Sequence, residues 1–361
     1  VRLHKLPSLD LYNPEHSFRP KKVKYLLNPL NMYEYLTMCY GRFPEPFTFG
    51  VRAYRYLQKR KEGFDIVHDN QCLAYGIGKI AQHIVPTIAT IHHPITVDRQ
   101  EEFKSATTRK GIRKVKRWYS FIRMQKEVAR QLSHIVTVSE CSKVDIAEEF
   151  SIPSSRFRVV PNGINKEFFY PVHNASRPEN SIIVTNSADT PLKGLRYLLE
   201  AVALIRKTQP LKLTVIGEPK KNGIIKKLVA DLAIEDIVRF TGRIANEEFA
   251  GYYSNATIAV VPSLYEGFGL PAAEAMACGV PLISTSGGAL PEVVGDAGII
   301  VPPADAASLA REITFLFNHP EQRKKLAKAG IERVDSIFNW SKAAGDMVDV
   351  YREAIHDYRG N

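Results

Sequence analysis

The sequence lacks the features that mark membrane-spanning and disulfide-bonded proteins. None of its apolar runs approaches the roughly 18–20 residues that span a bilayer, and no apolar leader of the secretory kind stands near the N-terminus. Its four cysteines are far apart and form no CxxC pair, which argues against a disulfide framework or zinc cluster and favours a reducing cytosol. No group of His, Asp and Glu has metal-ligand spacing, and no Ser/His/Asp triad can be identified.

The chain does contain an ordinary globular composition with an uneven charge. Its 361 residues are 45% hydrophobic and 24% charged, which excludes wholesale disorder and indicates two domains, or three. The net charge is +11, but residues 1–170 carry 28 Lys or Arg against 16 Asp or Glu, a net +12, whereas residues 171–361 carry 21 against 22, a net −1. A basic half indicates a nucleic acid, an anionic membrane surface or a phosphorylated substrate as partner.

Two segments of the chain alternate strand and helix signals. The predicted strands of the first segment are residues 64–68, 85–91, 134–138 and 157–160. Those of the second are residues 181–185, 211–216, 237–241, 258–262, 281–285 and 298–301. Strands that alternate with helices form parallel sheets with helices on both faces, so we expect two doubly wound α/β domains. Residues 1–50 carry few signals apart from a strand-like start at 1–6.

The feature with the most chemistry is the block YEGFGLPAAE at residues 265–274. It places Glu266 on the loop after a predicted strand and Glu274 in the first turn of a helix that starts near Pro271. The glycines let the backbone approach a ligand closely, and free N–H groups at the helix start favour an anion such as a diphosphate. The two carboxylates can then accept hydrogen bonds from hydroxyls on either side. The alternative is an ordinary helix start whose acids stabilise the helix dipole.

This block resembles the E-x7-E motif of the retaining glycosyltransferases of family 4, which have the GT-B fold. The resemblance extends from about residue 64 to the C-terminus and includes six further segments in matching order. These are TIHHP (90–94), VSECSK (138–143), VPNGI (160–164), LKG (192–194), FTG (240–242) and AMACGVP (275–281). It implies two doubly wound, Rossmann-like domains facing across a cleft: residues 1–170 for the acceptor and residues 171–340 for the nucleotide sugar. A last helix within 341–361 is expected to cross back to the first domain.

The resemblance also implies roles for single residues. His92 would lie beside the reacting centre, Glu266 would bind hydroxyls of the donor sugar, and Lys193 would neutralise the diphosphate leaving group. Glu274 would bind the ribose. The other donor-binding residues implied by the match are Ser187, Gly217, Arg243, Ile244, Phe268, Gly269 and Leu270. Taken alone, Lys193 would pass for a surface lysine and His92 for an exposed loop residue, so both assignments depend on the family context.

The sequence departs from the family pattern at two places. Family members carry an arginine six residues before the lysine, and here that position is Ser187, which brings a hydrogen bond but no charge. Leaving-group stabilisation then depends more on Lys193 and on the helix start. The family also opens with a strand and a glycine-rich loop, which nothing before Val1 matches. We therefore expect that first unit to be cut away or to reside on another chain.

A strongly basic stretch covers residues 104–126, which contain nine Lys or Arg and no Asp or Glu. Its apolar residues recur at helical spacing, so it predicts an amphipathic helix for an anionic membrane surface, or a solvated helix packed on its own domain. The residues assigned to membrane or acceptor contact are Lys110, Arg113, Lys114, Arg117 and Trp118. Nucleic acid is disfavoured because no nucleic-acid-binding motif accompanies the patch.

Together these features predict a retaining hexosyltransferase, peripheral at the cytoplasmic face of the plasma membrane. The donor would be a UDP- or GDP-sugar, with UDP slightly favoured by family frequency, and no metal or cofactor is expected. The acceptor would be a lipid or a lipid-linked glycan. Two alternatives stay open: a GT-B nucleotide-sugar epimerase, and a non-catalytic or incomplete subunit that needs a separate N-terminal segment. The basic half would serve the acceptor, since the donor phosphates need only Lys193 and backbone amides.

Overall fold

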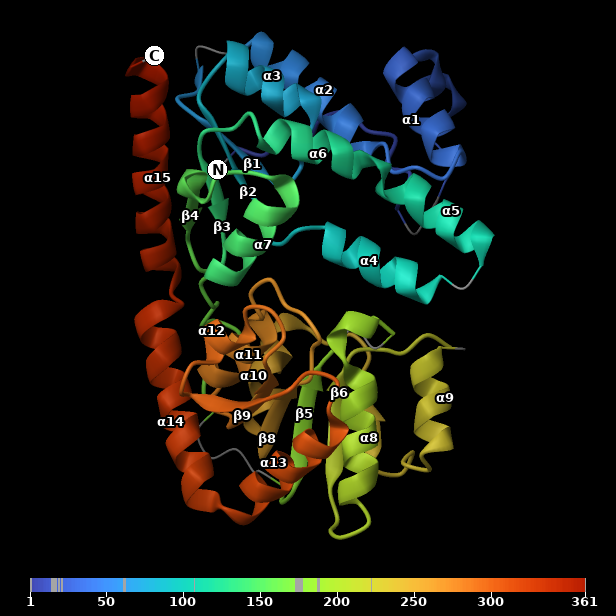
Figure 1. Ribbon diagram of the computed structural model, residues 1–361, viewed down its shortest axis with the longest axis vertical. Helices are drawn as coiled ribbons and strands as arrows, with labels where there is room; N and C mark the ends of the chain where they lie inside the picture. The colour runs from blue at the N-terminus through green and yellow to red at the C-terminus, as the bar shows by residue number, and fades with distance from the viewer. Residues whose placement is uncertain are drawn as a thin grey trace. The chain divides into compact units, whose positions relative to one another are not determined.

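The chain folds into two compact units, each built on a parallel sheet (Figure 1). The computed structural model describes residues 2–13, 18, 20, 22–60, 63–106, 108–172, 178–186, 189–221 and 223–360. Unit 1 consists of Val1–Thr137, Lys143–Val159 and Met347–Asn361, and unit 2 of Val138–Ser142 and Val160–Asp346. Packing therefore assigns residues from Val160 onward to unit 2, where the sequence predicted a boundary at 170.

Unit 2 contains a six-stranded parallel sheet in the order β10-β9-β8-β5-β6-β7. Its strands are β5 (Ser181–Thr185), β6 (Lys212–Ile216), β7 (Val238–Phe240), β8 (Ile258–Val261), β9 (Leu282–Thr285) and β10 (Gly298–Val301). The chain leaves the central β5 toward β6 and β7, then returns to add β8 on the other side of β5. This reversal between β5 and β8 is the doubly wound order, and ligands bind outside the carboxyl ends of the strands at such a point.

Helices cover both faces of the unit 2 sheet, as the sequence predicted. Along β5, Ile182 and Val184 belong to one apolar cluster and Ile183 to the other, because successive strand residues point to opposite faces. The first cluster contains residues of α8 (Leu195–Ile205), α9 (Ile224–Asp231) and α13 (Ala306–Asn318). The second contains residues of α10 (Phe249–Ser254), α11 (Leu270–Ala277) and α12 (Leu290–Val294), and α14 (Pro320–Ile337) contributes to both.

Unit 1 contains four parallel strands that follow each other in chain order. They are β1 (Val67–Asn70), β2 (Thr87–Thr90), β3 (Ile135–Thr137) and β4 (Phe157–Val159). One apolar cluster joins this sheet to α2 (Glu45–Gln58), α3 (Tyr75–His83), α6 (Ile122–Ala129) and α7 (Glu140–Phe150). The helices α2 and α3 touch through glycines: a Cβ on Gly76 would lie 1.9 Å from the carbonyl oxygen of Gly50. Gly76 therefore serves close helix packing.

The last helix, α15 (Trp340–Gly360), contacts unit 1 through its second half. The hydroxyl of Tyr351 lies 2.9 Å from Nδ1 of His68 on β1. Further along, Asp357 pairs with His134 at 2.9 Å. These contacts explain why residues from Met347 onward pack as part of unit 1 although they follow unit 2 in the chain.

The N-terminal part of unit 1 is helical where the sequence carried few signals. Residues 2–10 form no strand, so the strand-like start at 1–6 was wrong for the described residues. The chain forms a 3-10 turn (Val23–Leu27) followed by α1 (Pro29–Cys39). The basic stretch is divided among the end of α4 (Thr96–Ser105), α5 (Arg109–Trp118), a 3-10 turn (Tyr119–Phe121) and α6. No helix in the described part of the chain is long and apolar enough to cross a membrane.

Candidate active site

Two oppositely charged side chains meet at the carboxyl ends of β5 and β8, where the strand order of unit 2 reverses. Lys193 ends a 3-10 turn (Pro191–Lys193) in the connection from β5 to α8, and Glu266 lies on the loop between β8 and α11. Nζ of Lys193 lies 2.8 Å from Oε1 of Glu266, and the hydroxyl of Ser263 donates to the same oxygen at 2.8 Å. The side chains are 32% and 10% exposed. The pair is therefore held in place yet open to a ligand.

The two loops that carry this pair are joined by their backbones. Gly194 has φ +62°, and a Cβ there would lie 1.9 Å from the carbonyl oxygen of Pro262 at the end of β8. The N–H of Leu264 donates to the carbonyl of Leu192 at 2.7 Å. Only glycine fits such a close approach at a left-handed position. The LKG segment is thus a packing requirement as well as the carrier of a lysine.

Asn186, directly after β5, positions the turn of Lys193. Its side-chain amide donates to the carbonyl of Lys193 at 2.9 Å, and its backbone N–H donates to Ile216 at the end of β6. Asn186 is 5% exposed, and its Oδ1 is buried without a hydrogen-bond partner. No sequence motif pointed to Asn186, although site residues often lie directly after a central strand.

The loop of Glu266 is also held by two serines from a distant part of the chain. The hydroxyls of Ser139 and Ser142 donate to the carbonyl of Gly267 at 2.6 and 2.8 Å, and both serines are fully buried. On the other side, the N–H of Ala289 donates to the carbonyl of Glu266 at 2.9 Å. The segment VSECSK, which carried part of the family resemblance, therefore shapes the glutamate loop from within unit 2.

The helix α11 begins where the sequence predicted. Gly269 is its N-cap with φ +101°, Leu270 is its first residue, and Glu274 follows in the next turn. Burial raises the pKa of Glu274 to about 7. The ring of Phe268 is buried and packs against Phe338 at 5.4 Å between centroids, so its side chain belongs to the core. Only the backbone of Phe268 can serve the site.

A pocket of about 760 Å³ opens beside Lys193, a size typical of small-molecule sites. Four predicted residues line it, namely Lys193, Gly217, Arg243 and Ile244. The backbones of Gly217 and Gly242 pair across its wall, where the N–H of Gly242 donates at 3.2 Å. Sequence reasoning missed Lys220 and Lys221, which lie on the loop after β6 and add two exposed cations to the same pocket.

His92 belongs to unit 1, just beyond the end of β2. Its backbone N–H donates to Oε1 of Gln71, and its Nε2 lies 2.8 Å from Oδ1 of Asn70. Gln71 has φ +58°, a backbone conformation that costs energy outside glycine and often marks functional loops. Burial, and secondly the charge of His93, lower the pKa of His92. His92 is therefore neutral at neutral pH.

The cations of the basic stretch lie on the exposed face of α5. Lys110, Arg113, Lys114 and Arg117 are all exposed. Most of the apolar face is covered: Val115, Tyr119 and Ile122 form a buried cluster that includes Phe103 of α4, whereas Ile112 is 37% exposed. Trp118 is half-buried, with its ring 5.1 Å from that of Phe43. This apolar face packs within unit 1, as expected for a solvated helix on its own domain.

Comparisons with known proteins identify the family of the chain. Two family models match consecutive halves of the chain: Glycosyltransferase Family 4 over residues 10–168 and Glycosyl transferases group 1 over residues 167–333. The MMP alpha-(1→4)-mannosyltransferase of Mycolicibacterium hassiacum is 43% identical over 359 residues, which are 98% of this chain and 86% of that protein. The chain belongs to glycosyltransferase family 4.

More distant matches include a sequence relative and a solved structure. A D-inositol 3-phosphate glycosyltransferase of Streptomyces bingchenggensis is 29% identical over 335 residues, covering 87% of this chain and 71% of that protein. Sucrose-phosphate synthase from Thermosynechococcus elongatus superposes with a TM-score of 0.73 at 28% identity, covering 86% of this chain and 78% of that one. The predicted family and fold are thereby confirmed.

In this family 4 glycosyltransferase, the residues assigned from sequence are divided between the two units. The donor-site group gathers in unit 2 at the carboxyl ends of the strands, apart from Ser187, which lies outside the described residues. His92 and the cations of α5 belong to unit 1. The residues that sequence reasoning missed are Asn70, Gln71, Ser139, Ser142, Asn186, Lys220 and Lys221. Each of them lies at or just after the carboxyl end of a strand, or belongs to a matched motif. That position is the signal that would have found them.

Proposed function

We propose that this glycosyltransferase moves a mannosyl group, with retention of configuration, from a nucleoside diphosphate sugar to a hydroxyl of a glycan. The observation that carries the proposal is the pair of Lys193 and Glu266, 2.8 Å apart at the strand-order reversal and beside a pocket of about 760 Å³. The choice of mannose follows the relative that is 43% identical and is named as an alpha-(1→4)-mannosyltransferase.

The pair can bind a donor without being separated. Lys193 has three N–H donors and uses one on Glu266, so the others can meet diphosphate oxygens. Both hydrogen bonds to Glu266 fall on Oε1, which leaves Oε2 for hydroxyls of the sugar. The N–H groups at the start of α11 add further donors for the diphosphate. For the ribose we propose Glu274, whose carboxyl group can accept hydrogen bonds from neighbouring hydroxyls.

The proposed chemistry transfers one glycosyl bond and one proton. The bond between the anomeric carbon and the diphosphate oxygen breaks while the acceptor oxygen attacks the same face of the sugar. The leaving phosphate oxygen takes the proton of the acceptor hydroxyl. Catalysis then consists of positioning and of stabilising the charge that develops on the diphosphate, which is the role of Lys193. His92, being neutral, contributes hydrogen bonds and position rather than charge.

For the acceptor, we propose a glycan carried by a lipid at the cytoplasmic face of a membrane. The exposed cations of α5 support this assignment because they suit anionic lipid headgroups. The base of the donor is left to experiment, with UDP and GDP both compatible with a pocket of this size.

Two measurements test the proposal. Calorimetry of the full chain with GDP-mannose, UDP-glucose, GDP and UDP should detect binding of at least one sugar nucleotide. Binding should be lost in Lys193→Met. NMR of the product formed with a mannose-containing oligosaccharide should then show a new α-linked mannose. A β-linked product would refute retention, turnover of the donor to an epimer without acceptor would favour an epimerase, and binding of no sugar nucleotide would overturn the donor site.

A further inference from the structure

Helix α1 exposes a row of apolar residues on its outer side. Its exposed residues follow a helical stripe and carry no charge: Pro29, Met32, Tyr33, Leu36, Cys39 and Tyr40. Leu36 and Tyr40 are each 58% exposed. An ordinary surface helix places its apolar stripe against the core and its polar residues outside. In α1 apolar residues lie on both sides: Met38 and Tyr35 pack inside with Leu9 and Leu11, so the outer apolar residues call for a physical reason.

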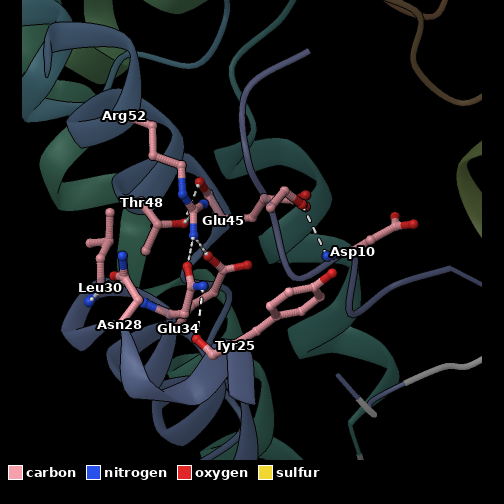
Figure 2. A network of polar contacts seen from close by, with 10 residues as sticks. Asp10, Tyr25, Asn28, Leu30, Glu34, Glu45, Thr48 and Arg52 are labelled. Carbon is pink, nitrogen blue, oxygen red and sulfur yellow. Dashed lines mark hydrogen bonds and ion pairs between the residues drawn. The ribbon is translucent and has the colours of Figure 1, made fainter. Parts of the chain in front are cut away.

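The inner side of α1 is held by a polar network (Figure 2). Glu34, which is 2% exposed, forms an ion pair with Arg52 of α2 and accepts its hydrogen bond at 2.5 Å. The same guanidinium donates to Asn31 of α1 at 2.8 Å and to Thr48 of α2 at 3.1 Å. Breaking a buried ion pair of this kind leaves an uncompensated charge and is costly. The network therefore fixes the rotation of α1 and keeps its apolar stripe outside.

The exposed apolar surface continues into the turn before α1. Val23 is 79% exposed and Leu27 is 86% exposed. The side chain of Asn28 caps α1 by accepting from the N–H of Leu30 at 2.9 Å, which joins the turn to the helix. The α1 stripe, as we call residues 23, 27, 32, 33, 36 and 40 together, is therefore one apolar surface on two joined elements. Contiguous exposed apolar surfaces of this kind mark interaction sites.

The α1 stripe lies beside the cations of α5. The guanidinium of Arg117 sits over the ring of Tyr40, 4.5 Å from its centroid. All six cations of α5, which are Arg109, Lys110, Arg113, Lys114, Lys116 and Arg117, are exposed, and none has a carboxylate partner among the described residues. Lys22, Lys24 and Arg42 add exposed positive charge next to the stripe. Between Lys22 and Arg42 the sole carboxylate is the buried Glu34.

We propose that the α1 stripe inserts into the headgroup region of an anionic lipid bilayer while the cations of α5 bind the lipid phosphates. Aliphatic side chains beside unpaired cations suit such an interface. A second copy of the chain is disfavoured because a symmetric contact through this surface would bring two sets of cations together. A nucleic acid could stack on Tyr33 and Tyr40, but the other four residues of the stripe are aliphatic or thioether side chains, which suit lipid better than bases. This proposal rests on the proposed function, because the surface would bring the enzyme to an acceptor carried by a lipid.

The test is co-sedimentation of the full chain with phosphatidylcholine vesicles, with and without phosphatidylglycerol. We expect binding to the anionic vesicles only, weakened by salt. Leu27→Ser combined with Leu36→Ser should weaken vesicle binding at least about tenfold, because serine gains little from burial in the bilayer whereas leucine gains much. Arg113→Glu combined with Lys114→Glu should weaken it on the order of 30-fold or more, since each cation near the surface contributes about fivefold.

Matched controls come from unit 2. Leu204 is 44% exposed on α8, so Leu204→Ser tests loss of an exposed leucine in general. Lys226 and Lys227 are adjacent exposed cations on α9, so their replacement by Glu tests general charge. Neither control should change vesicle binding. Calorimetry with GDP-mannose and UDP-glucose reports on the donor site separately, so a failed donor site and a failed membrane surface give different results.

Four outcomes would overturn the inference. One is absence of binding to anionic vesicles even at low salt. The second is binding that the Leu27→Ser, Leu36→Ser variant retains in full, because the α1 stripe would then not insert. The third is a dimer in analytical ultracentrifugation that the same variant dissociates, because the stripe would then belong to a contact between copies. RNA binding as tight as vesicle binding would likewise refute a lipid-specific surface.

Discussion

The ion pair of Lys193 and Glu266 should respond unequally to removal of its two charges. Glu266 is 10% exposed, so Lys193→Met leaves a nearly buried carboxylate whose described hydrogen bond comes from Ser263. Breaking a fully buried pair costs about 3–5 kcal/mol, and the 32% exposure of the lysine reduces this to about 2 kcal/mol. Glu266→Gln keeps an acceptor for both neighbours and leaves a cation that reaches water, so it should cost below about 1 kcal/mol.

Activity should follow a different order, which separates the catalytic role from the structural one. Removing a group that stabilises developing diphosphate charge costs about 10²–10³ in kcat, so Lys193→Met should be nearly inactive. The double variant Lys193→Met, Glu266→Gln should regain most of the lost stability, because the unpaired charge is gone, but none of the lost activity.

Urea denaturation and steady-state kinetics of the three variants measure both effects. The exposed pair of Lys166 and Asp335 in unit 2 provides the control, with side chains 53% and 51% exposed. Lys166→Met should change stability by less than about 1 kcal/mol. The reasoning is refuted if both single variants destabilise equally, or if the double variant regains turnover together with stability.

Three further predictions concern the surroundings of this pair. Gly194→Ala should prevent donor binding in calorimetry, because its Cβ would lie 1.9 Å from a carbonyl oxygen at the end of β8. Ser139→Ala should cost about 2 kcal/mol in urea denaturation and raise the KM for donor, because the carbonyl of Gly267 loses a buried 2.6 Å hydrogen bond. Ser284→Ala should cost less, because that equally buried hydroxyl makes only long, weak hydrogen bonds of 3.5 Å. Equal costs for the two variants would contradict a structural role for the hydrogen bond from Ser139 to Gly267. The pKa of Glu274 is raised from 4.5 to about 7, so its stabilising contribution is complete below pH 4.5 and is lost as pH rises through 7. Between pH 4.5 and 7, the free energy of unfolding of Glu274→Gln should therefore change less with pH than that of the unmodified protein. An equal pH dependence of the two proteins would show that Glu274 does not titrate in this range.

The unit 2 sheet could be predicted almost strand by strand. The strands β5 and β10 have the predicted bounds, and the other four lie within the predicted ranges. Buried parallel strands are continuous apolar runs with clear ends, so their signal is local. The short helices α10 and α12 escaped prediction because six and five residues carry too little periodicity.

The contacts of the site were less accessible than its residues. Lys193 and Glu266 were each assigned to a ligand, and nothing in the sequence indicated that these residues, 73 positions apart, bind each other. The clamp from Ser139 to Gly267 spans 128 positions and depends on where the two loops lie in space. Helix α1 was missed for another reason: apolar residues lie on its outer side as well as its inner side, so it lacks the one-sided pattern that identifies surface helices.

The net charge of a half of the chain does not predict the charge of the pocket within it. The half of the chain beyond residue 170 has a net charge of −1, which indicated that the donor phosphates meet only one lysine. The pocket is nevertheless lined by Lys193, Lys220, Lys221 and Arg243 and by one acid, Glu218, and the balance stays positive when the pairing of Lys193 with Glu266 is included. Potential at a site depends on the charges that line it, because charges farther away than about 10 Å are screened by salt. The pocket is therefore cationic within a nearly neutral half, and the excess charge of the first half remains for the surface formed by α5 and the α1 stripe.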